Sequence, residues 1–257
     1  MWFCEKAAQC RGIDISKFPT EPAMRAKADA AYDAVLQLLY SYALVPGQHL
    51  SDKDLASKLK IGRTPVREAL IRLAAEGKII SLPQRGYFTR PLIEWALLDL
   101  YTLAREILIF ALARAQSQAP DLAAPRYELS PTELALRAEA IFTEIAQRAS
   151  NCEMCKIIDK FCFCTHPVRM EIAASEPSPS FRRSIAKLTD VMPQLGDAAG
   201  AVKSALMSHL DLEQSALSGV VQDMNTRWLT SFSLEARNSR ANPPLQEGKH
   251  VIRDELT

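Results

Sequence analysis

Two arginines lie close together at a predicted helix start, where their side chains could bind nucleic acid. They are Arg63 and Arg67, in the segment Gly-Arg-Thr-Pro-Val-Arg-Glu-Ala-Leu that runs from Gly62 to Leu70. An arginine can donate two hydrogen bonds to the O6 and N7 atoms of guanine. The free N–H groups of a first helical turn can bind a phosphate. The segment therefore predicts a surface that contacts both the bases and the backbone of a duplex.

The same segment indicates where the helix begins and which side of it is buried. Thr64 can cap the helix with its side-chain oxygen, and Pro65 suits the first turn because its missing N–H would have no partner there. Three aliphatic residues recur at spacings of four and three, which places them on one buried stripe. They are Val66, Leu70 and Leu73. The two arginines fall outside that stripe, so they face solvent or a duplex.

The residues around this helix predict a small domain of helices and one β-hairpin. Pro46-Gly47 is a stop signal after an apolar helical pattern. Ser51, with Asp54 three residues later, resembles a capping box and opens a short helix. Two β-type runs flank Pro83–Gly86, which is typical of a hairpin turn. The expected helices span residues 30–44 and 51–59 and run from the cap at Thr64 to about Glu76, and the expected strands span residues 79–82 and 87–89.

The whole stretch resembles the winged helix-turn-helix of GntR-family regulators, over roughly residues 29–90. It is most similar to the FadR branch, whose FCD-type second domain is an all-helical ligand-binding bundle. One departure is Gly62, where the family usually has Ser, which leaves Thr64 as the substitute cap. The resemblance is carried by an ordered set of motifs: Pro46-Gly47, Leu50, Leu55-Ala56, Arg63 to Leu70, Leu73, Glu76-Gly77 and Arg85-Gly86.

The resemblance implies a homodimer that binds an inverted-repeat operator in double-stranded DNA. The wing would place Arg85 in the minor groove. Local charge agrees, because residues 51–90 hold nine Lys or Arg and four Asp or Glu, a net charge of +5 in a chain of +1. Taken alone, that charge would also fit a solvated basic face. The candidate DNA contacts are Arg63, Thr64, Pro65, Arg67, Arg72, Arg85 and Gly86.

After Pro91 the pattern predicts helices only. A stripe of Trp95, Leu98, Tyr101, Arg105, Leu108 and Leu112 predicts one long helix, and further helices are expected near 132–150, 152–173, 181–192, 198–217 and 220–237. Few glycines and no repeat favour an antiparallel bundle. We therefore expect a mainly α fold: an N-terminal extension (1–28), a winged helix-turn-helix (29–91), a helical effector-binding and dimerisation domain (92–240) and a polar tail (241–257).

Many bundles of the resembled branch hold a divalent metal with one Asp and three His. The corresponding positions here are Glu139, Thr143, His209 and about Ser231. One carboxylate and one imidazole should bind a transition metal weakly, so we expect a pocket without a metal or other cofactor. Arg105 lies where the branch usually has an Arg, and it could hold a carboxylate-bearing effector through two hydrogen bonds. The alternative is that Arg105 pairs with Glu139 or another acid as an internal strut.

Four cysteines in one predicted helix allow two interpretations. They are Cys152, Cys155, Cys162 and Cys164, followed by His166. On one helix Cys164 lies nearly opposite the other three, so four thiolates cannot surround one ion. Free cysteine is often buried as a small apolar group, and we favour core packing. A metal- or thiol-sensing regulator stays open as an alternative, as does a regulator whose bundle only dimerises.

Composition and motifs bound the function. A length of 257 residues fits two domains. No apolar run approaches the roughly 18 residues of a membrane span, and the first residues do not resemble a secretion signal. We therefore expect a cytoplasmic protein without a membrane partner, and no disulfide between Cys4 and Cys10. No recognised nucleophile or phosphate-loop motif is present, which disfavours an enzyme with a Cys nucleophile and His166 or His209 as base. A transcription regulator, most often a repressor among relatives, is the expected function.

Overall fold

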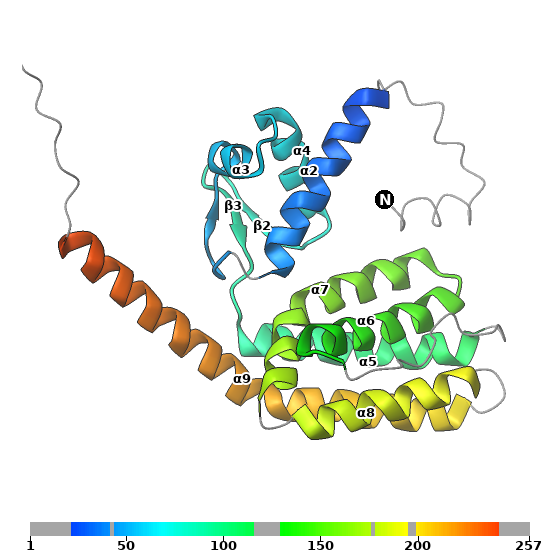
Figure 1. Ribbon diagram of the computed structural model, residues 1–257. Helices are drawn as coiled ribbons and strands as arrows, with labels where there is room; N and C mark the ends of the chain where they lie inside the picture. The colour runs from blue at the N-terminus through cyan, green and yellow to red at the C-terminus, as the bar shows by residue number, and fades with distance from the viewer. Residues whose placement is uncertain (1–21, 42–43, 116–128, 176–177, 195–198, 242–257) are drawn as a thin grey trace, which may run out of the picture. The chain divides into compact units, whose positions relative to one another are not determined.

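The computed structural model describes residues 22–41, 44–115, 129–175, 178–194 and 199–241. Within these residues, helices and a small sheet form an N-terminal domain, and helices alone follow it (Figure 1). The expected mainly α fold, with a winged helix-turn-helix followed by a helical bundle, is therefore confirmed. Most of the expected extension and all but the first residue of the expected tail lie outside the described residues.

The N-terminal domain combines three helices with a three-stranded antiparallel sheet. The helices are α2 (Pro22–Tyr40), α3 (Asp52–Leu59) and α4 (Arg63–Ala75). The strands are β1 (His49–Leu50), β2 (Ile79–Leu82) and β3 (Gly86–Thr89), in the order β1-β3-β2. Ile80 pairs with Phe88, and Leu50 pairs with Tyr87. The sequence analysis missed β1, because two residues are too few to show a period.

The first helix differs from the expectation at both ends. It begins at Pro22 rather than Ala30, and it ends at Tyr40 rather than Leu44. Proline fits this start because its fixed φ suits a first helical turn and its missing N–H would have no partner there. Residues 22–28 were expected in the extension and are helical instead. Tyr42, which was counted in the apolar pattern, falls outside the described residues.

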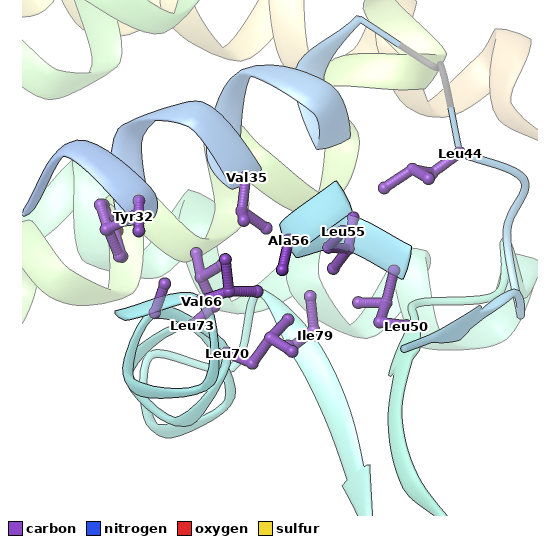
Figure 2. Close-up of a cluster of buried hydrophobic side chains, with 12 residues drawn as sticks. Tyr32, Val35, Leu44, Leu50, Leu55, Ala56, Val66, Leu70, Leu73 and Ile79 are labelled. Carbon is purple, nitrogen blue, oxygen red and sulfur yellow. The ribbon is translucent and has the colours of Figure 1, made fainter. Parts of the chain in front are cut away.

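The buried stripe predicted for α4 is confirmed. Val66, Leu70 and Leu73 are each 0% exposed and pack with Val35 of α2 and Ile79 of β2 (Figure 2). Fully burying one such side chain stabilises the fold by roughly 1.5–3 kcal/mol. This packing fixes the rotation of α4 about its own axis. The opposite side of the helix consequently faces outward.

The helical domain consists of consecutive helices joined by short turns where the connections are described. They are α5 (Glu94–Arg114), α6 (Pro131–Arg148), α7 (Cys152–Ala174), α8 (Ser178–Val191), the short 3₁₀ helix η2 (Met192–Gln194) and α9 (Ala199–Ala241). Ser130 forms a full capping box with Glu133 at the start of α6, and the Asn151 side chain caps α7. The two helices expected at 198–217 and 220–237 are one helix, α9. The part of α9 from residue 222 to residue 241 belongs to a second unit, separate from the residues up to Val221.

The buried face of α5 differs from the predicted stripe. Tyr101 and Leu108 are buried as expected, but Trp95 is 68% exposed and Leu98 is 36% exposed. The face that packs on α6 and α7 includes Ala104 instead. An apolar helix offers more than one stripe of suitable spacing, and packing against neighbours selects among them. None of the helices in the described ranges is long and apolar enough to cross a membrane.

Candidate nucleic-acid interface and buried polar cluster

Helix α4 presents two arginines on its exposed side. Arg67 is exposed, and no described residue forms an ion pair or hydrogen bond with its side chain. Arg63 lies one turn earlier, with a 65% exposed side chain that donates a hydrogen bond to Asp52 Oδ1 at 3.0 Å. A solvent-exposed ion pair contributes about 0–1 kcal/mol. A DNA phosphate or base can therefore replace Asp52 at little cost.

The start of α4 differs from the prediction in its cap. The helix begins at Arg63, Gly62 is the N-cap residue, and no side chain caps the helix. Thr64 is already inside the first turn, so the predicted capping role of Thr64 is wrong. With Gly62 in an extended conformation as the N-cap residue, the helix begins two residues before the position that capping by Thr64 requires. Pro65 lies in the first turn as predicted, and the uncapped N–H groups of this turn suit an anion.

Arg72 has a different environment from the other arginines of α4. Its guanidinium donates hydrogen bonds to Asp29 and Glu76, both at 3.1 Å. It also lies 4.0 Å from the centre of the Tyr32 ring, within the range of a cation–π contact. These contacts hold α4 against α2. We therefore assign Arg72 to the packing of the N-terminal domain rather than to DNA contact.

The hairpin of β2 and β3 places Arg85 in an exposed turn. The Leu82 carbonyl accepts a hydrogen bond from the Arg85 N–H at 3.1 Å. Gly86 has a φ of 89°, in the left-handed region. A Cβ added to Gly86 would also lie 3.1 Å from His49 Nε2. Glycine is consequently favoured at this position by conformation and by space, and it supports the wing that carries Arg85.

A buried lysine joins the end of α4 to α7. Lys78 Nζ lies 3.1 Å from the Tyr32 hydroxyl, 3.2 Å from Glu76 and 3.0 Å from Asp159 of α7. Burial alone would lower the pKa of Lys78, but Asp159, Tyr32 and Glu76 together raise that pKa above its usual range. The ammonium therefore stays charged. These three contacts match the three N–H donors of a lysine.

The helical domain encloses a buried polar cluster around Arg169 of α7. Arg169 is 0% exposed, and its Nε donates to Glu213 of α9 at 2.9 Å. Its Nη1 donates to Glu139 of α6 at 3.3 Å. The rings of Phe142 and Phe161 lie 5.1 and 4.9 Å from the central guanidinium carbon. Two carboxylates and two aromatic faces thus compensate the buried charge.

Two histidines and a tyrosine complete the cluster. His166 Nδ1 lies 2.7 Å from Glu139 Oε1. His209 Nε2 lies 3.0 Å from Glu213 Oε1, and the Tyr101 hydroxyl donates to Glu213 at 2.7 Å. The cluster therefore links α5, α6, α7 and α9 through polar side chains. Each buried polar group in such a cluster needs its partner, so replacing any one of these residues should leave another without a hydrogen bond.

We expect the cluster to make the free energy of unfolding depend on pH. Although burial works in the opposite direction, Arg169 and His209 lower the pKa of Glu213 from 4.5 to about 2. The unfolded chain binds this proton more readily, so the stabilisation is complete above about pH 4.5 and is lost as the pH falls towards 2. It amounts to about 3 kcal/mol at most. Urea unfolding between about pH 6 and pH 2 measures this dependence. Glu213→Gln should flatten it, and equal slopes in both proteins would contradict the assignment.

The structure brings two of the predicted ligand-binding residues into this cluster. Glu139 binds His166 and Arg169, and His209 lies 3.0 Å from the Ser184 hydroxyl as well as contacting Glu213. Thr143 is half-buried on α6. Ser231 lies in the part of α9 whose side chains are not described. Within the described residues, no group of three or more His, Cys, Asp or Glu side chains could hold a metal ion.

Arg105, the predicted effector anchor, lies on α5 outside the cluster. Its guanidinium pairs with Asp211 of α9 and donates to Gln214 at 2.6 Å. This is the arrangement of the strut alternative, with Asp211 rather than Glu139 as the acid. The Asp211 side chain is 65% exposed, so this pair lies near the surface.

The four cysteines of α7 are free thiols. Cys162 and Cys164 are buried, and burial raises the pKa of both. Cys152 and Cys155 are partly exposed near the start of the helix. A thiol with a raised pKa is a poor nucleophile and a poor metal ligand at neutral pH. Packing therefore remains the favoured role for Cys162 and Cys164.

Arg169 and Glu213 were not among the predicted site residues. A usable signal existed for Arg169, since it is a cation between the apolar residues Val168 and Ile172 on a helix. Charged residues are almost never fully buried unless they are paired. A buried arginine therefore predicts an acid nearby, although it does not say which helix supplies that acid.

Comparison with known proteins places the N-terminal domain in a family. Residues 27–89 match the family described as bacterial regulatory proteins, gntR family. The chain is 44% identical over 63 residues to the Nta operon transcriptional regulator of Aminobacter aminovorans, which covers 24% of this chain and 30% of that protein. It is also 44% identical over 45 residues to the HTH-type transcriptional repressor RspR of Escherichia coli (strain K12), which covers 18% of this chain and 20% of that protein.

Solved structures resemble a larger part of the chain. Escherichia coli McbR/YncC has a TM-score of 0.55 at 18% identity, covering 77% of this chain and 98% of that chain. A putative GntR transcriptional regulator from Rhodococcus sp. RHA1 has a TM-score of 0.58 at 15% identity, covering 76% of this chain and 98% of that chain. At these identities the likeness concerns the fold.

The molecule is a winged helix-turn-helix protein with a helical second domain. The N-terminal domain matches the gntR family of bacterial regulatory proteins, and over this domain the chain is similar to curated transcriptional regulators. The predicted family resemblance is thereby confirmed for the N-terminal domain, and a helical second domain follows it, as expected. The matched sequence is confined to less than a third of the curated relatives, so it does not extend to what the helical domain binds.

Proposed function

We propose that this protein regulates transcription by binding double-stranded operator DNA through α4 and the β2–β3 wing. The observation that carries the proposal is the pair Arg63 and Arg67, exposed one turn apart on the side of α4 opposite its buried stripe. In a winged helix-turn-helix, this side of the helix enters the major groove. Arg63 and Arg67 then contact base edges or adjacent phosphates, while Thr64 and Pro65 position the helix end. Arg85, supported by Gly86, contacts the minor groove from the wing.

The proposed functional unit is a homodimer on an inverted-repeat operator. A two-fold dimer presents two recognition helices to successive major-groove faces of the duplex. The similarity to RspR, which is a repressor by name, supports repression as the direction of regulation. The helical domain supplies the dimer contacts and senses a small organic acid, whose capture shifts operator affinity. Because Arg105 already pairs with Asp211, an acid anchored there would have to displace that carboxylate.

A selection experiment tests this function. We expect the protein to enrich duplexes with two inverted half-sites from a library of random sequence. The half-site centres should lie about one helical turn apart, or a multiple of it. Analytical ultracentrifugation of the selected duplex should show two chains per duplex. Failure of the folded protein to enrich any motif would contradict DNA recognition, and one chain on a single half-site would contradict the dimer.

A further inference from the structure

A cavity of about 70 Å³ lies between the N-terminal domain and helices α5 and α7. Its wall is mostly aliphatic and includes Leu39 of α2, Leu97 and Leu100 of α5 and Pro167 of α7. An engineered closed apolar cavity of about 150 Å³ binds benzene, so a cavity of this smaller volume encloses a smaller group or one end of a ligand.

The charged side chains that line this cavity are Lys78 and Arg90, and no described Asp or Glu lines it. Lys78 already contacts Glu76 and Asp159. Arg90 is different: its Nη1 donates to the Gly77 carbonyl at 3.1 Å, and none of the described carboxylates pairs with it. A half-buried guanidinium without a carboxylate partner is a strong binding site for one, because it can donate two parallel hydrogen bonds to the carboxylate oxygens.

The positive charge of Arg90 acts on another residue of the cavity wall. Cys164 of α7 also lines the cavity. Burial raises the pKa of the Cys164 thiol, and the positive charge of Arg90 is the largest influence that opposes this rise. The wall therefore combines an aliphatic surface with one guanidinium that no described carboxylate contacts. A molecule with a hydrocarbon chain and a single carboxylate matches that combination, whereas a second carboxylate would be buried against aliphatic carbon without a partner.

We propose that this cavity, the Arg90 pocket, binds a short-chain monocarboxylic acid. The carboxylate pairs with the Arg90 guanidinium, and the hydrocarbon chain lies against the aliphatic residues of α5 and α7. The small volume favours a short hydrocarbon chain over a long one. The anchor of the sensed acid is thereby Arg90, at the junction of the two domains, rather than Arg105.

The pocket also adjoins contacts that connect the two domains. Tyr40 of α2 lies edge-on to His166 at 4.8 Å and to Phe163 at 5.2 Å between ring centres. His166 in turn binds Glu139 of the buried cluster. A bound acid would lie beside these aromatic rings, which line the cavity. Binding can therefore bias the arrangement of the N-terminal domain. This regulatory meaning rests on the proposed function, whereas acid binding itself is measurable without DNA.

Calorimetric titration with pentanoate tests the pocket, with pentanamide as the uncharged analogue of equal shape. We expect saturable one-to-one binding of pentanoate and no binding of pentanamide. Arg90→Gln should weaken pentanoate binding by at least roughly tenfold. Ala96→Leu, which fills the cavity from α5, should abolish it. Arg114→Gln, at an exposed arginine on the same helix, is the matched control and should bind as the parent protein does.

Three results would overturn the pocket. They are no binding of pentanoate by the folded parent protein, equal binding of pentanoate and pentanamide, and unchanged binding by Arg90→Gln. Circular dichroism and thermal unfolding establish that each variant is folded. The selection of operator DNA is measured separately. A protein that selects an operator but ignores pentanoate would retain the proposed function and lose the pocket.

Discussion

Arg67→Ala is expected to weaken operator binding by roughly tenfold or more. Arg67 is exposed on α4 and has no partner among the described residues, so it is available for a base edge or a phosphate. A good bidentate contact to guanine contributes about 1–3 kcal/mol. A gel-shift titration at fixed salt measures the loss, with a duplex that the parent protein has selected.

Arg183→Ala is the matched control for this experiment. Arg183 is an exposed arginine on α8 whose guanidinium donates to the Ser180 hydroxyl, and its removal should leave operator affinity unchanged. Repeating the titration at several salt concentrations separates two kinds of contact. Loss of a phosphate contact lowers the salt slope by about one, whereas loss of a base contact relaxes sequence preference. Unchanged affinity of Arg67→Ala would count directly against α4 as the recognition helix.

Arg169→Met is expected to destabilise the helical domain by about 3–5 kcal/mol. The substitution removes the cation between Glu139 and Glu213, which are 7% and 0% exposed. Both carboxylates then stay buried without their main positive partner. Methionine preserves much of the side-chain volume, so the loss reports charge compensation more than a cavity. Urea unfolding at neutral pH measures the change in the free energy of unfolding.

A double variant distinguishes this charge effect from general damage to packing. Glu213→Gln removes one of the carboxylates that Arg169→Met leaves uncompensated. The two substitutions together should therefore destabilise the protein by less than the sum of their separate effects. Arg183→Met provides the matched exposed control. Additive effects, or a stability of Arg169→Met within about 1 kcal/mol of the parent protein, would show that the pair does not act as described.

The N-terminal domain was predictable because its signals are local. The stripe of Val66, Leu70 and Leu73, the Ser51 cap and the hairpin each depend on residues a few positions apart. The N-cap of α4 was predicted at Thr64, but it lies two residues earlier, at Gly62. That position depends on the backbone of the preceding turn, where Lys60 adopts a left-handed conformation. Spacing within the helix itself carries no information about that turn.

The partners of the charged residues could not be predicted in the same way. Arg169 and Glu213 are 44 positions apart, and Arg72 meets Asp29 across 43 positions. Arg72 was placed with the DNA contacts because its type and helix agree with that role. Its actual partners depend on how α2 packs against α4. Long-range ion pairs of this kind follow from tertiary packing, which a single sequence does not reveal.

The burial of Lys78 has a mechanical consequence for any movement between the two domains. Its ammonium group is shared by Glu76, at the end of α4, and Asp159, on α7. A gradual displacement of one domain against the other would leave the Lys78 ammonium buried without its carboxylate partners at intermediate positions. Leaving a buried charged group without its partner costs more than about 1–3 kcal/mol. Movement at this joint should therefore occur as a jump between two well-defined poses, in which the ammonium either keeps both carboxylates or exchanges one of them for water.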